Sequence, residues 1–278
     1  MEEIVYSAES QLLYPRSFIH SIFSDLRISP SVAWSLFLRT MRVQYRQTWL
    51  GYLWLLLPPL ATTLTWVYLS RANILNVGQT SAPYPLYVLT GTLLWQVFAE
   101  ALNCPLQQLT SARDIVSKTK IPHEALLLAA LIEILFNFAV RLITTLPALI
   151  WYKSPWSWTI LFAPFGVLML LLVGLTIGLL VTPVGLLYHD VSRGLGIVIG
   201  FWFFLTPVIY PPPVHWPASL LVTLNPVTPL LITTRNWLTL GTVAPATGFT
   251  LVIGLSLFFL VIGWLTYKLA KPHLIARL

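Results

Sequence analysis

The sequence predicts an all-α integral membrane protein, and three observations lead to this fold class. Of the 278 residues, 57% are hydrophobic and only 9% are charged, whereas a soluble domain carries about 25% charged residues. Several apolar runs approach or exceed the ~20 residues that a helix needs to cross a bilayer. These runs are continuous and lack the alternation that marks the strands of a β-barrel. A soluble enzyme, a disordered chain and a disulfide-stapled secreted domain are therefore excluded.

Six apolar segments are expected to be transmembrane helices, because lipid offers no partner for a free backbone N–H or C=O. They are Leu53–Ser70, Tyr84–Asn103, Ala125–Tyr152, Thr159–Thr182, Gly194–Tyr210 and Phe249–Leu269. The transmembrane domain then covers residues 53–270. A cytoplasmic N-terminal tail (1–30) and an amphipathic interface helix (31–52) precede it, and a cytoplasmic C-terminus (271–278) follows it.

The distribution of basic residues predicts the orientation, because cytoplasmic segments of membrane proteins carry an excess of Lys and Arg. With the N-terminus in the cytoplasm, the inner segments hold 12 Lys and Arg residues. The outer loops hold three, which are Arg71, Lys153 and Arg235. Arg141 lies within a span. Both termini are therefore expected on the cytoplasmic side.

The segment from Ser31 to Leu50 is expected to form a helix along the cytoplasmic membrane surface. Five apolar side chains recur in it at helical spacing: Trp34, Phe37, Leu38, Met41 and Tyr45. Three arginines fall together on an adjacent flank: Arg39, Arg42 and Arg46. Rings at the acyl boundary and guanidinium groups at the phosphates are typical of an interfacial helix. The alternative is a soluble amphipathic helix packed on another chain.

Two segments between the spans have distinctive compositions. The inner segment 104–124 is polar and contains Ile121-Pro122 near its end. The outer segment 211–248 is apolar but repeatedly broken by proline. Apolar, proline-broken sequence predicts short re-entrant helices between spans five and six, dipping into the outer leaflet or capping a cavity. An ordinary folded loop is the alternative.

Polar residues inside a span are costly and need a reason. Glu133, Asn137 and Arg141 recur every four residues in the third span, so they stack on one helix face. They are interpreted either as the lining of a pathway or a conformational latch, or as a contact with a neighbouring helix. Glu100, near the inner end of the second span, is interpreted as interfacial.

Small and aromatic residues in the spans suggest packing surfaces and a conduit. Gly174 and Gly178, and likewise Gly196 and Gly200, have the spacing that allows close helix approach.

Aromatic rings can form interfacial belts or a bundle core, and they can also line a conduit by packing on the apolar faces of sugars. Seven rings are candidates for that lining: Trp66, Tyr68, Trp95, Phe98, Trp202, Phe203 and Tyr210.

Catalytic and metal-binding motifs are absent from the sequence. Cys104 is the only cysteine, so neither an intrachain disulfide nor a cysteine metal cluster is possible. The five histidines show no ligand spacing, and neither a phosphate-binding G-x-x-x-x-G-K-[ST] loop nor an H-E-x-x-H motif occurs. The chain is predicted to have no catalytic residue, metal or cofactor. Energy for directed work would come from another subunit or from an ion gradient.

Four patches, in this order, resemble the permease subunits of type-2 ABC exporters, in the branch that moves O-antigen, capsular polysaccharide or teichoic acid. The patches are Tyr45–Trp54 running into Pro58-Pro59, Asp114–Lys118 through Ile121-Pro122, Tyr188-His189-Asp190-Val191, and Phe204–Tyr210 followed by Leu224-Asn225-Pro226. Together they cover most of the chain from about Arg39 onward. Two departures are modest, since Ile121 stands where an aromatic residue is usual and His189 where an arginine is common.

The resemblance implies a permease in the bacterial inner membrane. Two copies would pair, and two separate ATPase subunits, which carry the ATP and Mg²⁺, would dock on the inner side. The substrate would be a polyprenyl-diphosphate-linked glycan that threads a channel between the two copies, with Glu133, Asn137 and Arg141 among its lining. The diphosphate, or anionic lipid, would contact Arg39, Arg42 and Arg46. The residues that would receive the ATPase motion are Arg113, Asp114, Lys118, Lys120, Ile121, Pro122, His189 and Asp190.

Two other functions remain as alternatives. The first is a type-2 ABC permease for a smaller lipid or a drug. The second is a membrane-embedded glycan or lipid transferase, which would need clustered Asp, Glu or His residues facing one leaflet. The nine acidic residues are dispersed along the chain, so the transferase ranks below both permeases.

Overall fold

The computed structural model of the chain describes residues 29–43, 49–111 and 123–275, and every regular element within these ranges is helical. Residues 29–43 form a helical stretch. The other elements are α2 (Leu53–Arg71), α3 (Tyr84–Ser111), α5 (His123–Trp151), the 3-10 helix η2 (Trp158–Phe162), α6 (Ala163–Leu187), α7 (His189–Leu205), α8 (Ala218–Leu224), α9 (Val227–Thr239) and α10 (Phe249–Ile275). The predicted all-α fold class is confirmed.

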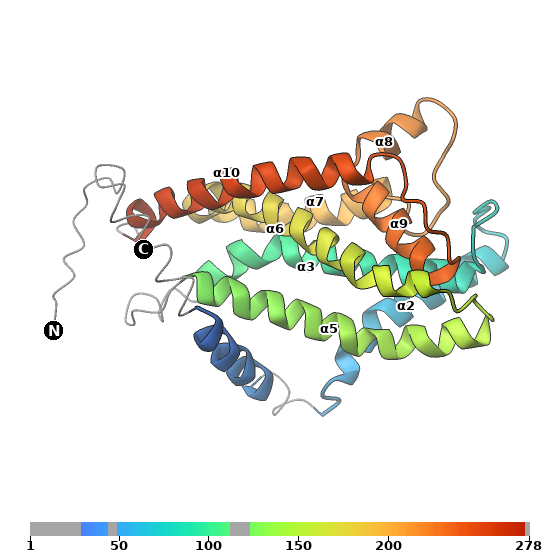
Figure 1. Cartoon of the computed structure of the whole chain (residues 1–278), viewed down its shortest axis with the longest axis horizontal. Coiled ribbons are helices and arrows are strands. Elements are labelled where there is room, and N and C mark those ends of the chain that lie inside the picture. The colour runs from blue at the N-terminus through green and yellow to red at the C-terminus, as the bar shows by residue number, and fades with distance from the viewer. Residues whose placement is uncertain (1–28, 44–48, 112–122, 276–278) are drawn as a thin grey trace.

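The long helices α3, α5, α6, α7 and α10 run along one axis, and their ends gather at two opposite ends of the bundle (Figure 1). One end holds the helical stretch 29–43, the end of α3, the start of α5, the turn between α6 and α7, and the last turns of α10. We call it the 29–43 end. The opposite end, the α8–α9 end, holds those two short helices, η2 and the connection between α2 and α3.

Four helical segments in the described ranges are long and apolar enough to cross a membrane: Leu53–Arg71, Glu124–Trp151, Trp158–Leu187 and Phe249–Lys268. The other two predicted spans fall on α3 and α7. α7 has 17 residues and is therefore about 26 Å long, whereas α3 has 28 residues but is interrupted by polar side chains such as Gln96 and Glu100. The count of six spans stays a prediction.

Two helix ends differ from the boundaries expected from hydropathy. α3 continues to Ser111, so the first eight residues of the predicted inner segment 104–124 are helical, because polarity alone does not end a helix. α7 ends at Leu205 instead of continuing to Tyr210. Thr206 after it has an extended backbone, as the residue before a proline prefers, and Pro207 has no N–H to continue the helix.

The centre of the bundle is the contact between α3 and α6. A Cβ atom added at Gly174 would lie 2.6 Å from the carbonyl oxygen of Phe98 and 2.8 Å from the Cβ of Ala101. Only glycine allows so close an approach of two helices, and the predicted packing role of Gly174 and Gly178 is confirmed. Gly196 and Gly200 differ, since a Cβ at either would meet nothing within 4 Å in the described chain.

The substitution Gly174→Ala is expected to destabilise the protein, because its methyl group would force α3 and α6 apart. Overpacking of this kind costs roughly 1–3 kcal/mol, and we expect the melting temperature of the detergent-purified protein to fall by several degrees. Gly254→Ala on α10 is the matched control, since its Cβ would meet nothing within 4 Å. Equal melting temperatures for the two variants would contradict the proposed role of the contact.

Candidate functional site

Five of the seven aromatic residues predicted to line a conduit come together in one cluster with Phe204. Trp66 comes from α2, Trp95 and Phe98 from α3, and Trp202 and Phe203 from α7. Ring centroids are 5.1 Å apart for Trp95–Phe98, 5.8 Å for Trp95–Phe203 and 5.2 Å for Phe98–Trp202. Phe204 continues the cluster, at 5.3 Å from Phe203 and 6.3 Å from Trp66. The contacts tie α2, α3 and α7 together.

Burial separates the cluster into a core and an edge. The exposed fraction of Trp95 is 6% and that of Phe98 is 0%, so both are enclosed within the chain and do not line a surface between two chains in this conformation. In this conformation they serve helix packing, and their place in a channel lining stays a prediction. Tyr68 and Phe204 are 69% and 54% exposed, and Trp66 is half-buried. The edge of the cluster therefore reaches the surface on α2 and α7.

α2 and α7 meet at Trp66 and Phe204, and both leave large apolar side chains without cover. We define the α2–α7 face by its exposed members: Leu57, Leu64 and Tyr68 on α2, and Ile197, Phe201 and Phe204 on α7. Only 11% of the residues in the apolar stretch of α2 are buried. On α7, a Cβ atom at Gly196 or Gly200 would meet no other atom of the described chain within 4 Å. Both helices therefore present surface that a neighbouring chain or lipid can cover.

A buried arginine organises the α8–α9 end. Arg235 on α9 is 1% exposed and donates hydrogen bonds to the carbonyl oxygens of Pro207 (3.1 Å) and Val208 (2.8 Å). Its guanidinium carbon lies 3.7 Å from the ring centroid of Tyr87 on α3, a cation–π contact. The Tyr87 hydroxyl donates to the carbonyl oxygen of Tyr210 (3.0 Å). Arg235 therefore fixes the chain after α7 between α3 and α9.

Asn225 ties the same segment to the two short helices. Its side-chain amide donates to the Thr206 hydroxyl (2.7 Å), and its oxygen accepts hydrogen bonds from the Trp202 indole (3.1 Å) and the Val227 backbone (3.0 Å). The network explains why both halves of the fourth resembling patch, Phe204–Tyr210 and Leu224–Pro226, occur together. The predicted short helices of segment 211–248 are present as α8 and α9, and their depth in the membrane stays a prediction.

The sequence did not indicate what Arg235 and Glu100 do. The charge distribution assigns Arg235 to an outer loop, whereas its place in an apolar, threonine-rich stretch is a signal of burial. Glu100 is not merely interfacial, because its carboxylate pairs with the Arg141 guanidinium on α5. Asn137 and Arg141 are 8% and 6% exposed, so they too lie inside the chain, whereas Glu133 is half-buried. The contact with a neighbouring helix, one of the two interpretations, is confirmed for Arg141.

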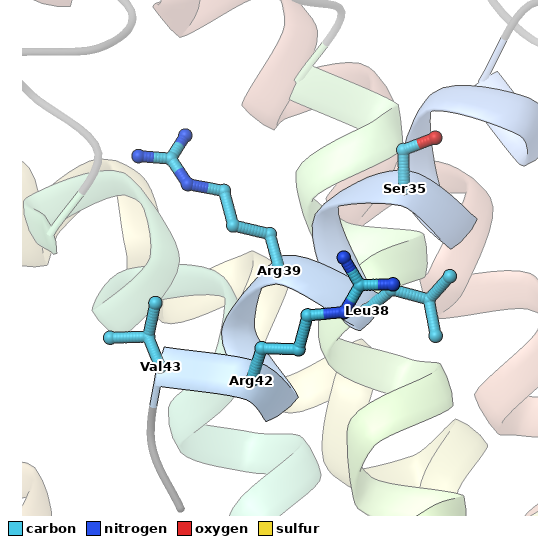
Figure 2. Close-up of a pocket in the computed structure, with 5 residues that line it drawn as sticks. All are labelled: Ser35, Leu38, Arg39, Arg42 and Val43. Atoms are coloured by element: carbon cyan, nitrogen blue, oxygen red, sulfur yellow. The ribbon is translucent and has the colours of Figure 1, made fainter. Parts of the chain in front are cut away.

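The helical stretch 29–43 packs one face on α5 and leaves its arginines open. Phe37 and Met41 cluster with Ala125 and Ala129, so part of the predicted lipid-facing stripe is covered by the chain itself. Arg39 and Arg42 are exposed and line a shallow groove of about 400 Å³ with Ser35, Leu38 and Val43 (Figure 2). Arg46 lies outside the described residues.

Most of the predicted ATPase-coupling residues lie outside the described part of the chain: Arg113, Asp114, Lys118, Lys120, Ile121 and Pro122. His189 begins α7, with its side chain outside the described part, and Asp190 is exposed in the first helical turn. Next to the undescribed segment, the Glu124 carboxylate pairs with the Lys268 ammonium of α10 at 3.2 Å. Both side chains are buried, so the start of α5 and the inner part of α10 are joined at the 29–43 end.

Long apolar helices, buried polar contacts between them and exposed arginines at one end define a helical membrane protein of the multi-pass type. Within the described ranges, no three His, Cys, Asp or Glu residues gather where a metal ion would bind. Residues 31–239 match the model of the ABC-2 type transporter family. The chain belongs to this family of transport permeases.

Three relatives cover most of the chain. It is 27% identical to the O-antigen export system permease protein RfbA of Myxococcus xanthus, over 71% of this chain and 76% of that protein. It is 23% identical to the protein of the same name from Klebsiella pneumoniae, over 79% and 88%. It is 22% identical to the polysialic acid transport protein KpsM of Escherichia coli, over 84% and 91%.

Replacing Arg235 by methionine is expected to destabilise the protein strongly, because the carbonyl groups of Pro207 and Val208 would lose their donors. We expect a loss on the order of 3 kcal/mol, measured as a fall in melting temperature. Arg71→Met is the matched control, since Arg71 is exposed at the end of α2. A similar melting temperature for both variants would show that Arg235 does not fix this end.

Proposed function

We propose that this chain is the permease subunit of an ATP-driven exporter of polyprenyl-diphosphate-linked polysaccharide, of the O-antigen, capsule or teichoic-acid type. The observation that carries the proposal is the match to three polysaccharide permeases over 76–91% of their length. The four patches of resemblance lie within the matched residues 31–239, and one of them coincides with the Arg235 and Asn225 contacts. The chain would act in the bacterial inner membrane with both termini in the cytoplasm.

In this proposal, ATP hydrolysis takes place on two copies of a separate ATPase subunit. Family membership supports this arrangement, together with the absence of a phosphate-binding loop from the sequence. The ATPase subunits dock at the 29–43 end, which holds the end of α3, the start of α5 and the turn at Tyr188–Val191. Asp190 is exposed there. The Glu124–Lys268 pair then links the start of α5, next to the docking segment, to α10.

Two copies of the chain pair through the α2–α7 face in this proposal, and the glycan passes between them. The apolar side chains left open on both helices support the choice of this face. Tyr68, Phe201 and Phe204 are the exposed rings of this face that would line the conduit, with Trp66 and Tyr210 half-buried. Flat rings suit a moving glycan because they contact the C–H faces of sugars without fixed hydrogen bonds.

Single cysteines on the α2–α7 face are expected to cross-link two copies in the membrane. In a Cys104→Ala background, we expect disulfide dimers for at least one of the variants Leu64→Cys, Ile197→Cys and Phe201→Cys, because the face meets its own copy. Leu251→Cys on α10, which is 63% exposed, is the control and should stay monomeric. Cross-linking confined to the control position would contradict pairing through α2 and α7.

The groove on the helical stretch 29–43 contacts the diphosphate of the substrate in this proposal, or anionic lipid headgroups. The exposed guanidinium groups of Arg39 and Arg42 support it, because arginine binds phosphate oxygens in bidentate fashion.

The double substitution Arg39→Gln and Arg42→Gln is expected to lower glycan export by roughly tenfold, because two charge-assisted hydrogen bonds are lost. Export is measured as glycan at the cell surface, with the amount of permease in the membrane determined in parallel. Arg71→Gln, at the opposite end, should export normally. Loss of the double variant from the membrane would instead assign these arginines to anchoring.

The direct test of the function is inactivation of the gene, followed by analysis of lipid-linked glycans on both sides of the inner membrane. We expect polyprenyl-linked polysaccharide to accumulate on the cytoplasmic side and surface polysaccharide to disappear. Loss of a smaller lipid or a drug from export, with normal surface polysaccharide, would support the other ABC permease. Loss of glycan synthesis itself would point to a transferase.

A further inference from the structure

Six polar side chains lie on the faces of α3 and α5 that the Glu100–Arg141 pair joins. The Glu100–Arg141 ion pair joins the two helices, and spacing of four residues places the others on the same faces. We call the set the α3–α5 seam, and its members are Gln96 and Glu100 on α3, and Glu133, Asn137, Arg141 and Thr145 on α5. The seam is separate from the α2–α7 face, because Asn137, Arg141 and Thr145 are at most 8% exposed.

The Glu100–Arg141 pair of the seam lies far from both ends of its helices. Glu100 follows the start of α3 by about 24 Å, and Arg141 follows the start of α5 by about 27 Å. Both helices are about 42–44 Å long by the same rise per residue, so the ion pair falls near the middle third of each. A membrane that encloses the bundle therefore surrounds these charges with its hydrocarbon layer.

Hydrogen-bonding atoms of both kinds are left over in the seam. Among the described residues, three acceptor oxygens have no partner: Gln96 Oε1, Glu100 Oε2 and Asn137 Oδ1. Two donors of Arg141, Nε and Nη1, also have none, and neither does the Thr145 hydroxyl. Each buried polar group without a partner costs several kcal/mol in hydrocarbon. Together they leave hydrogen-bonding capacity that the described chain does not use, and a small polar partner from outside the chain can take it up.

The mixture of donors and acceptors identifies the chemistry of that partner. A cation would satisfy the oxygens of Glu100 and Asn137 but would be repelled by Arg141. An anion would satisfy Arg141 but would be repelled by Glu100. A water molecule both donates and accepts and is small enough to enter between packed helices. We propose that the α3–α5 seam binds water inside each chain, at the depth of the membrane interior.

Accessibility of engineered cysteines to Ag⁺ tests the seam, because a thiol reacts through its thiolate, which forms only where water reaches it. In a Cys104→Ala background, Asn137→Cys and Thr145→Cys place thiols in the seam. Leu170→Cys on α6, where Leu170 is 0% exposed, is the dry core control. Ile143→Cys, on the other side of α5 and 61% exposed, is the lipid-facing control.

We expect Ag⁺ to block both seam thiols at least about tenfold faster than either control. The thiols that remain free are then measured by labelling with a maleimide after the protein has been denatured in detergent. Seam thiols that react as slowly as Leu170→Cys would overturn the proposal. Thr145→Cys is close in size to the native residue, so this variant alone decides the outcome should Asn137→Cys fail to accumulate. The result does not depend on the substrate, so it can fail while the proposed function holds.

Discussion

Hydrocarbon offers no hydrogen-bond partner, and this constraint governs where every polar group of the bundle lies. Several buried threonine hydroxyls donate to carbonyl oxygens one turn earlier in their own helix, as Thr63 does to Pro59 (2.7 Å) and Thr182 to Gly178 (2.6 Å). Charges that must stay inside are paired or stacked, such as Lys268 with Glu124 and Arg235 with Tyr87. These charged side chains therefore lie where two helices contact each other.

The same constraint divides the helix surfaces into two kinds. α3 and α6 meet through glycine and apolar side chains, with Gly174 against the backbone of Phe98, and this contact forms the fixed centre of the chain. α2 and α7 are joined to the centre by the aromatic cluster but leave Leu64, Phe201 and their neighbours uncovered. The pairing proposed above would use the uncovered side chains of α2 and α7, while the contact between α3 and α6 stays within one chain.

Much of the architecture could be predicted from the sequence. Apolar runs located the long helices, because hydrophobic length is a local property that does not depend on contacts. The partners of Arg235 and Glu100 could not be predicted, because Arg235 contacts Tyr87 and Glu100 contacts Arg141 across distant parts of the chain. For the same reason, composition could not separate Trp95, which is enclosed, from Tyr68, which is exposed.

A passive pathway driven by a separate ATPase subunit should be inactive without that subunit, and reconstitution in vesicles can show this. The permease would be purified alone and with the subunit that co-purifies with it, and each preparation placed in vesicles with a polyprenyl-linked glycan. We expect that only the complex hydrolyses ATP and moves the glycan, with a hydrolysis rate that depends on the permease. Glycan movement or ATP hydrolysis by the purified chain alone would contradict it.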